Sequence, residues 1–198
     1  MIKIMIAITL MLALLTACSI APKDKQTVST YDFGLPNQIL ADNRTRLTIR
    51  PDIPSVSSPT WLDTPAILYR LAYQDSARLQ PYADSRWAAS PAALLTLRLR
   101  QAIAAVTPDS GAPKQHELQV ALEEFSQIFD APGISRVLLR ASVKLLSEDG
   151  RDILAERTFA IERPSPTGDA NGAVKALTQA SDEFITQVAN WLKDLPNI

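Results

Sequence analysis

Apolar and polar residues alternate along three consecutive segments in the C-terminal half of the chain. In the first segment, Leu118, Val120 and Leu122 share one parity, whereas Phe125 and Phe129 take the opposite parity. Alternation with a period of two is typical of a strand with one buried face. The change of parity falls at residues 123–124, where it predicts a β-bulge or a kink.

The next two segments alternate and are joined by a hairpin signal. The turn Glu148-Asp149-Gly150-Arg151 favours a tight reversal, because glycine readily adopts positive φ and aspartate tolerates it. The three segments therefore predict an antiparallel sheet covered on one face only. The inward positions expected in the second and third strands are Val137, Leu139, Ala141, Val143 and Leu145, then Ile153, Ala155, Phe159 and Ile161.

Two segments have the spacing of amphipathic helices. The first begins at Ser90-Pro91, because serine can cap the free amide groups and proline fits the first helical position. It runs to about Val106. The second follows a loop at 164–169 and ends before Pro196. Its apolar face holds Val174, Leu177, Ser181, Phe184, Val188 and Trp191.

The N-terminal half carries shorter strand signals. Residues 31–34 lead into an alternating strand at 47–49, and we expect further strands at 67–73 and 78–82. The proline-rich segment 51–65 is interpreted as an ordered loop or an edge, since proline cannot donate to a central ladder. The simplest arrangement is an α+β fold: a two-layer sandwich of a mainly antiparallel sheet with two long helices on one face.

The N-terminus has the features of a lipoprotein leader. Lys3 precedes an apolar run at residues 4–17, which is too short to span a bilayer. The sequence Leu15-Thr16-Ala17-Cys18 resembles the bacterial lipobox, in which a signal peptidase cuts before the cysteine and lipid is attached to it. An ordinary signal peptide with an accidental cysteine and a retained transmembrane helix are the alternatives. We predict a signal peptide at 1–17, a lipidated tether at 18–30 and one domain at 31–198.

Lipidation at Cys18 with acyl chains such as palmitate implies a Gram-negative cell envelope. Two or three acyl chains give stable anchoring where one would not. Ser19 stands where an aspartate favours inner-membrane retention in enterobacterial lipoproteins. The resemblance therefore implies the periplasmic face of the outer membrane.

Composition excludes several functional classes. The formal net charge of −1 does not resemble a nucleic-acid-binding footprint. Once Cys18 is lipidated, no cysteine remains for a disulfide or a thiol nucleophile. One histidine without cysteine ligands makes a zinc site improbable, and six glycines leave little room for a phosphate-binding loop. We expect neither a metal nor a cofactor.

The residues that could act as acids or bases do not form a catalytic pattern. His116 is interpreted as a surface or strand-edge histidine. Glu123 and Glu124 are adjacent in a strand and face opposite sides, so they cannot act together without the bulge. We therefore predict that the protein is not an enzyme.

Aromatic residues and arginines alternate in the segment 61–87. A partner-binding surface is one interpretation, because exposed aromatic residues and arginine dominate interfaces. Burial at the open end of a small sheet is the other. The candidate surface comprises Trp61, Tyr69, Arg70, Tyr82, Arg86 and Trp87.

Several segments in order resemble the PqiC-like auxiliary lipoproteins of MCE-type ABC lipid transport. These are the lipobox, Tyr31-Asp32-Phe33-Gly34, Trp61-Leu62-Asp63, Tyr69-Arg70-Leu71, Arg86-Trp87-Ala88 before Pro91, Leu122, Phe125, Phe129 and Ser135, and the helix ending in Trp191. The resemblance implies a non-enzymatic lipoprotein that docks an MCE-domain protein and assists transport of phospholipid or another hydrophobic compound between membranes. It also makes a ring of copies an expectation, since a ring could match a symmetric partner.

Two other functions remain open on the sequence. One is a non-enzymatic envelope lipoprotein that regulates a cell-wall enzyme. The other is a cell-envelope hydrolase, which requires a cleft with a perturbed acid.

Overall fold

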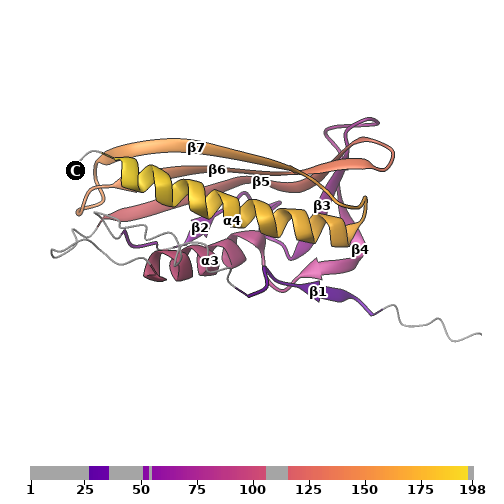
Figure 1. The fold of residues 1–198 in the computed structure, drawn as a ribbon, viewed down its shortest axis with the longest axis horizontal. Helices are drawn as coiled ribbons and strands as arrows, with labels where there is room; N and C mark the ends of the chain where they lie inside the picture. The colour runs from indigo at the N-terminus through magenta and orange to yellow at the C-terminus, as the bar shows by residue number, and fades with distance from the viewer. Residues whose placement is uncertain (1–26, 36–50, 54, 106–115, 196–198) are drawn as a thin grey trace, which may run out of the picture.

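The computed structural model describes residues 27–35, 51–53, 55–105 and 116–195 (Figure 1). The predicted strand at 47–49, Val106 and Cys18 lie outside these residues. Within the described residues, seven strands form one sheet. The elements are β1 (Ser29–Tyr31), β2 (Val56–Ser57), β3 (Ala66–Leu71), β4 (Leu79–Trp87), α3 (Pro91–Ala105), β5 (Glu117–Ala131), β6 (Ile134–Leu146), β7 (Ile153–Pro164) and α4 (Ala170–Asp194).

The sheet is mixed and open. Its strand order is β1-β4-β3-β5-β6-β7, and β2 pairs with β5 beside β3. The long ladders β5–β6 and β6–β7 are antiparallel, as is β3–β4. The ladders β1–β4, β2–β5 and β3–β5 are parallel. The predicted α+β class with two helices on the sheet is confirmed. The parallel ladders of β2 and β3 with β5 arise because the chain passes from β3 through β4 and α3 before it returns as β5.

The predicted irregularity in β5 is confirmed. The register changes between Leu122, opposite Ala141, and Glu124, opposite Arg140, so Glu123 is the extra residue. An extra residue restores the inward direction for the following apolar positions. Leu122 and Phe125 are therefore both buried despite their opposite parity.

The prediction for the start of β7 was wrong. Ile153 was expected inward and is exposed. A register shift between Leu145 and Leu146 places Ile153 opposite Leu146 at the end of the ladder. Downstream, Phe159 and Ile161 are buried as predicted.

Strand β4 is longer than predicted, since it reaches Trp87 rather than Tyr82. Pro81 lies within it and is exposed. At the other end of the described chain, β1 takes in Ser29 and Thr30, which the sequence interpretation assigned to the tether.

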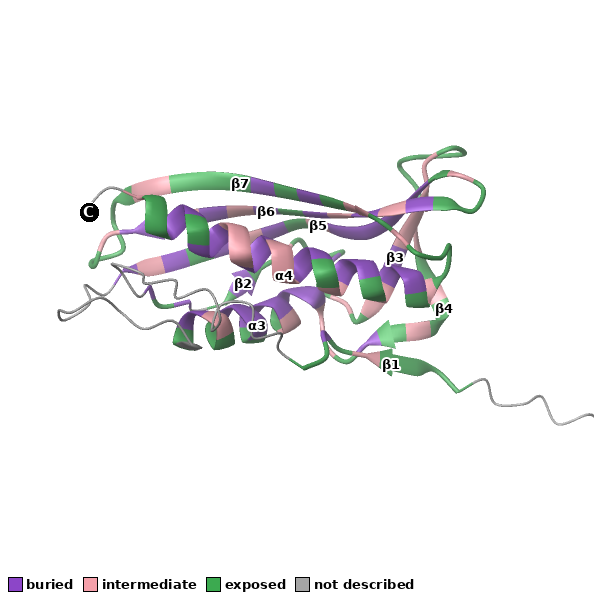
Figure 2. Ribbon diagram, viewed as in Figure 1, coloured by how far each residue is buried: buried purple, intermediate pink, exposed green. Residues whose placement is uncertain are grey.

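Both helices begin where the sequence predicts. Asp169 caps α4, because its carboxylate accepts a hydrogen bond from the Gly172 amide at 2.8 Å. The long helix α4 crosses β5, β6 and β7, and α3 lies beside it over β2 (Figure 1). Figure 2 shows their buried stripes turned toward the sheet. Among the described residues, no helix is long and apolar enough to span a bilayer.

Two aromatic groups fill the core between helices and sheet. Phe33 packs edge-on against Trp87, with ring centroids 5.5 Å apart, and Phe125 joins them. Phe159 on β7 packs edge-on against Phe184 of α4 at 5.6 Å. Edge-to-face packing of this kind adds about 0.5–1.5 kcal/mol beyond the area buried.

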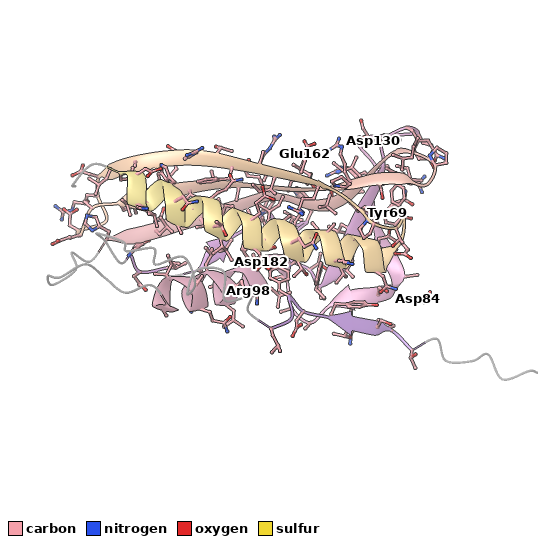
Figure 3. The ribbon with its side chains drawn as sticks, in the orientation of Figure 1. Tyr69, Asp84, Arg98, Asp130, Glu162 and Asp182 are labelled. Atoms are coloured by element: carbon pink, nitrogen blue, oxygen red, sulfur yellow. The ribbon has the colours of Figure 1, made fainter. Side chains whose placement is uncertain are left out.

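A largely buried ion pair joins the two helices. The Arg98 guanidinium on α3 donates from Nε and Nη2 to one carboxylate oxygen of Asp182 on α4, at 3.0 and 2.9 Å (Figure 3). Its Nη1 donates to the carbonyl oxygen of Gly34 at 3.1 Å. One arginine thus connects α3, α4 and the segment that follows β1.

Removing Arg98 should destabilise the fold strongly. Arg98→Ala leaves the Asp182 carboxylate buried without this partner, and losing one member of a buried pair costs about 3–5 kcal/mol. The free energy of unfolding in urea measures the loss. Arg136→Ala, which removes a more exposed arginine paired with Asp130, is the control and should cost about 1 kcal/mol or less. Equal losses for both variants would contradict the role assigned to Arg98.

Candidate partner-binding surface

The exposed part of the candidate surface is formed by the turn before β3 and by β3 itself. Trp61 is 43% exposed. The Arg70 guanidinium lies over its ring, 5.9 Å from the ring centroid. Arg70 also donates from Nη2 to Glu124 Oε2 at 3.0 Å. This Trp61–Arg70–Glu124 cluster is therefore an aromatic ring held against a cation that a carboxylate fixes in place.

Glu124 is the member that sequence reasoning missed. It was weighed only as one of two adjacent acids, Glu123 and Glu124. In the structure Glu123 is exposed, whereas Glu124 is partly buried and pairs with Arg70. The parity change in β5 signalled the bulge, but the partner comes from β3, 54 residues earlier.

Tyr69 and Tyr82 lie on the opposite face of the sheet from Arg70. The side chains of adjacent strand residues point to opposite faces of the sheet, so those of Tyr69 and Arg70 point in opposite directions. The Tyr69 ring lies 4.7 Å from that of Tyr82 and 6.0 Å from that of Phe129 (Figure 3 labels Tyr69). The six predicted residues therefore do not form one continuous surface.

The Tyr82 hydroxyl begins a buried polar network. It donates to Gln127 Oε1 at 2.5 Å. The Gln127 amide nitrogen donates in turn to Ser135 Oγ at 2.9 Å and to the Thr167 carbonyl oxygen at 3.2 Å. The network connects β4, β5, β6 and the loop before α4. Its role is to satisfy the polar groups of Gln127, which is completely buried in the centre of the sheet.

Burial raises the pKa of the Tyr82 phenol well above its ordinary value, and the nearby Tyr69 and Asp169 add to the effect. Folding therefore favours the neutral phenol. The corresponding stabilisation is complete below the ordinary tyrosine pKa of about 10 and is lost as the pH rises beyond it.

The side chains of Arg86 and Trp87, at the end of β4, point to opposite faces of the sheet. Arg86 is exposed and donates from Nε to Thr30 Oγ1 of β1 at 3.3 Å. Trp87 is only 1% exposed and packs against Phe33 and Phe125. The inclusion of Trp87 in a partner surface was wrong, because alternation along β4 turns its side chain into the core.

The candidate catalytic residues are dispersed. His116 lies at the edge of β5 as predicted but is buried rather than at the surface, and its carbonyl oxygen accepts from the Asp52 amide at 2.8 Å. In the described parts of the chain, no group of three or more His, Cys, Asp or Glu side chains is arranged to hold a metal ion.

An open cavity of about 500 Å³ lies between β2 and the start of α3. Thr96 and Arg100 form its helical wall, and their side chains are used by the fold. Thr96 Oγ1 accepts from the Val56 amide at 2.9 Å, and Arg100 Nε donates to the Ile53 carbonyl oxygen at 2.8 Å. The cavity is thus bounded by groups that hold the segment around β2 against α3.

Comparisons with known proteins point to one family. A family model described as ABC-type transport auxiliary lipoprotein component matches residues 38–189. A crystal structure from Xanthomonas campestris, assigned to the DUF330 family model, has a TM-score of 0.64 and 21% identity; the match covers 75% of this chain and 85% of that one. The crystal structure of a protein described only as uncharacterized has a TM-score of 0.62 and 18% identity, covering 83% and 98%. The search of curated proteins gave no match.

Tyr82→Phe tests the buried network through its pH dependence. At neutral pH the variant should lose about 1 kcal/mol of unfolding free energy, because Gln127 loses its donor. Above about pH 10 the wild type should lose stability faster than the variant, so the difference between them narrows. Urea unfolding at several pH values measures this difference. Tyr73→Phe, at an exposed position, should leave the unfolding free energy at neutral pH unchanged. If the difference in unfolding free energy between the wild type and Tyr82→Phe does not change with pH, the role assigned to the Tyr82 hydroxyl is contradicted.

Proposed function

The chain belongs to the family of ABC-type transport auxiliary lipoprotein components, and from this premise we propose that it docks an MCE-type ABC transport system and assists the transport of phospholipid or another hydrophobic compound between membranes. The family match over residues 38–189 is the observation that carries the proposal. In this proposal the protein catalyses no reaction. It holds the transport system close to the membrane in which its own lipid anchor is inserted.

The anchor in this proposal is the lipidated Cys18, held in the periplasmic face of the outer membrane. The lipobox resemblance at residues 15–18 supports it. The short distance in sequence from Cys18 to β1 also supports it, since it keeps the folded domain near the bilayer. Two or three acyl chains would make this attachment stable.

The Trp61–Arg70–Glu124 cluster is the proposed contact with the MCE-domain partner. Trp61 presents a large ring to solvent, and Glu124 restrains the Arg70 guanidinium beneath it. Tryptophan and arginine are the residue types that most often dominate interface energies, and restraint before binding reduces the entropy lost on association. Arg86, exposed at the end of β4, lies outside this cluster and is a weaker candidate.

A non-enzymatic role fits the described side chains. The ion-paired acids Glu124, Glu162, Asp182 and Glu183 are spread over β5, β7 and α4, and Glu124 is paired with Arg70. A ring of copies is part of the proposal, because a closed ring would present several identical contacts to a symmetric partner.

Affinity capture from crosslinked native membranes tests the docking role. The wild type should recover an MCE-domain protein, identified by mass spectrometry. Trp61→Ala should weaken recovery strongly, because loss of a central anchor residue costs about 2 kcal/mol or more, or about thirtyfold in affinity. Cys18→Ala should release the protein from the membrane.

Leu97→Ala is the matched control, since Leu97 is an exposed apolar residue on α3, away from the cluster. It should recover the partner as the wild type does. Recovery of a cell-wall synthase or hydrolase without an MCE-domain protein would replace the proposal with the regulatory function.

A further inference from the structure

Two turns project from one end of the sheet and expose large apolar side chains there. Tyr73, in the turn between β3 and β4, is 41% exposed, and Ile134, at the start of β6, is 65% exposed. The Tyr73 amide donates to the Phe129 carbonyl oxygen at 3.4 Å, which holds the first turn against the end of β5. Residues 72–78 and 131–134 thus form one end surface, called here the turn end.

The chain enters the fold at the same end. β1 begins on the side of the molecule where these turns and the first residues of α4 lie, and the turn 147–152 lies at the other end with the last turn of α4 (Figure 1). The Tyr31 hydroxyl donates to Asn171 Oδ1 at 2.7 Å, which fixes β1 to the first turn of α4. Val28, just before β1, is also exposed.

The length of the chain before β1 limits which end can reach a bilayer. Residues 18–28, which precede β1, span at most about 36–40 Å when fully extended, at about 3.3–3.6 Å per residue. The strand β6 alone, from Ile134 to Leu146, separates the two ends by about 40 Å. A lipid on Cys18 therefore reaches the end with the 147–152 turn only if the whole segment before β1 is fully extended, whereas it reaches the turn end without that extension.

We propose that the turn end rests on the bilayer that holds the acyl anchor, with Tyr73 and Ile134 in the interfacial region. This inference rests on the proposed lipidation of Cys18. Tyrosine suits this depth because its ring is apolar and its hydroxyl polar. Asp130, at the end of β5, pairs with Arg136 at 3.0 Å, and Arg136 also pairs with Glu162 at 3.3 Å. The long strands of the sheet then run away from the bilayer surface, and the 147–152 turn is directed away from the membrane.

Site-specific fluorescence in reconstituted vesicles tests this orientation. Cys18 is the only cysteine and is consumed by lipidation, so an introduced cysteine is a unique labelling site. Ser76→Cys places a fluorophore in an exposed turn at the turn end, and Glu148→Cys places one at the opposite end. The full lipidated chain is reconstituted in vesicles of phosphatidylethanolamine and phosphatidylglycerol containing headgroup-nitroxide lipid.

The fluorophore on Ser76→Cys should be quenched at least severalfold more than that on Glu148→Cys. Tyr73→Ser with Ile134→Ser should reduce that quenching while the protein stays bound. Equal quenching at both ends, or stronger quenching at Glu148→Cys, overturns the orientation. Flotation distinguishes failure of the anchoring from failure of the orientation. If the wild type does not float with the vesicles, the proposed anchoring is wrong. If it floats but the fluorophore on Ser76→Cys is not quenched, only the orientation is rejected.

Discussion

The need to cover one apolar face of the β5–β6–β7 sheet governs the structure. Each of these strands alternates, so one face is apolar along its whole length and must be removed from water. The 25-residue helix α4 supplies most of that cover. Its Asp169 cap fixes where it begins, and the Arg98–Asp182 pair fixes α3 beside it. The position of β1 follows, because Arg98 and Asn171 both hold the segment around Tyr31 and Gly34.

This arrangement leaves distinct surfaces for distinct tasks. The Trp61–Arg70–Glu124 cluster lies on the sheet face opposite Tyr69 and Tyr82, whose network is committed to holding the strands and the start of α4 together. The turn end lies on the same side of the molecule as the beginning of β1 (Figure 1). In the proposed account, the membrane contact and the partner contact use different side chains, and they adjoin at Arg70, whose Nη1 donates to the carbonyl oxygens of Ser76 and Ala77 in the turn end.

Local pattern was sufficient to predict much of the fold. The alternation in β5–β7, the bulge beside Glu123 and the Ser90-Pro91 helix start depend on neighbouring residues, and the structure has all three except at the start of β7, where Ile153 is exposed. The parallel pairing of β2 and β3 with β5 was not predicted, because it depends on where a crossover through α3 returns the chain. Strand periodicity carries no information on that choice.

The candidate site was predicted less well for a similar reason. Residue type placed Trp61, Tyr69 and Arg70 in one candidate surface. The structure brings Trp61 and Arg70 together, whereas the side-chain direction along β3, which residue type does not give, turns Tyr69 to the other face. Trp87 was misplaced because the length of β4 was underestimated. The partners of Arg70 and Tyr82, Glu124 and Gln127, lie far along the chain, and such pairs follow from the sheet order rather than from spacing.

The most direct test of the account is photocrosslinking in intact cells from the position of Trp61. A photoreactive phenylalanine analogue replaces Trp61 in one strain and Leu97 in another, and the covalent adducts are identified by mass spectrometry. The account predicts an adduct with an MCE-domain protein from position 61 and none from position 97. An adduct with a cell-wall enzyme from position 61, or an MCE adduct from position 97 alone, would contradict it.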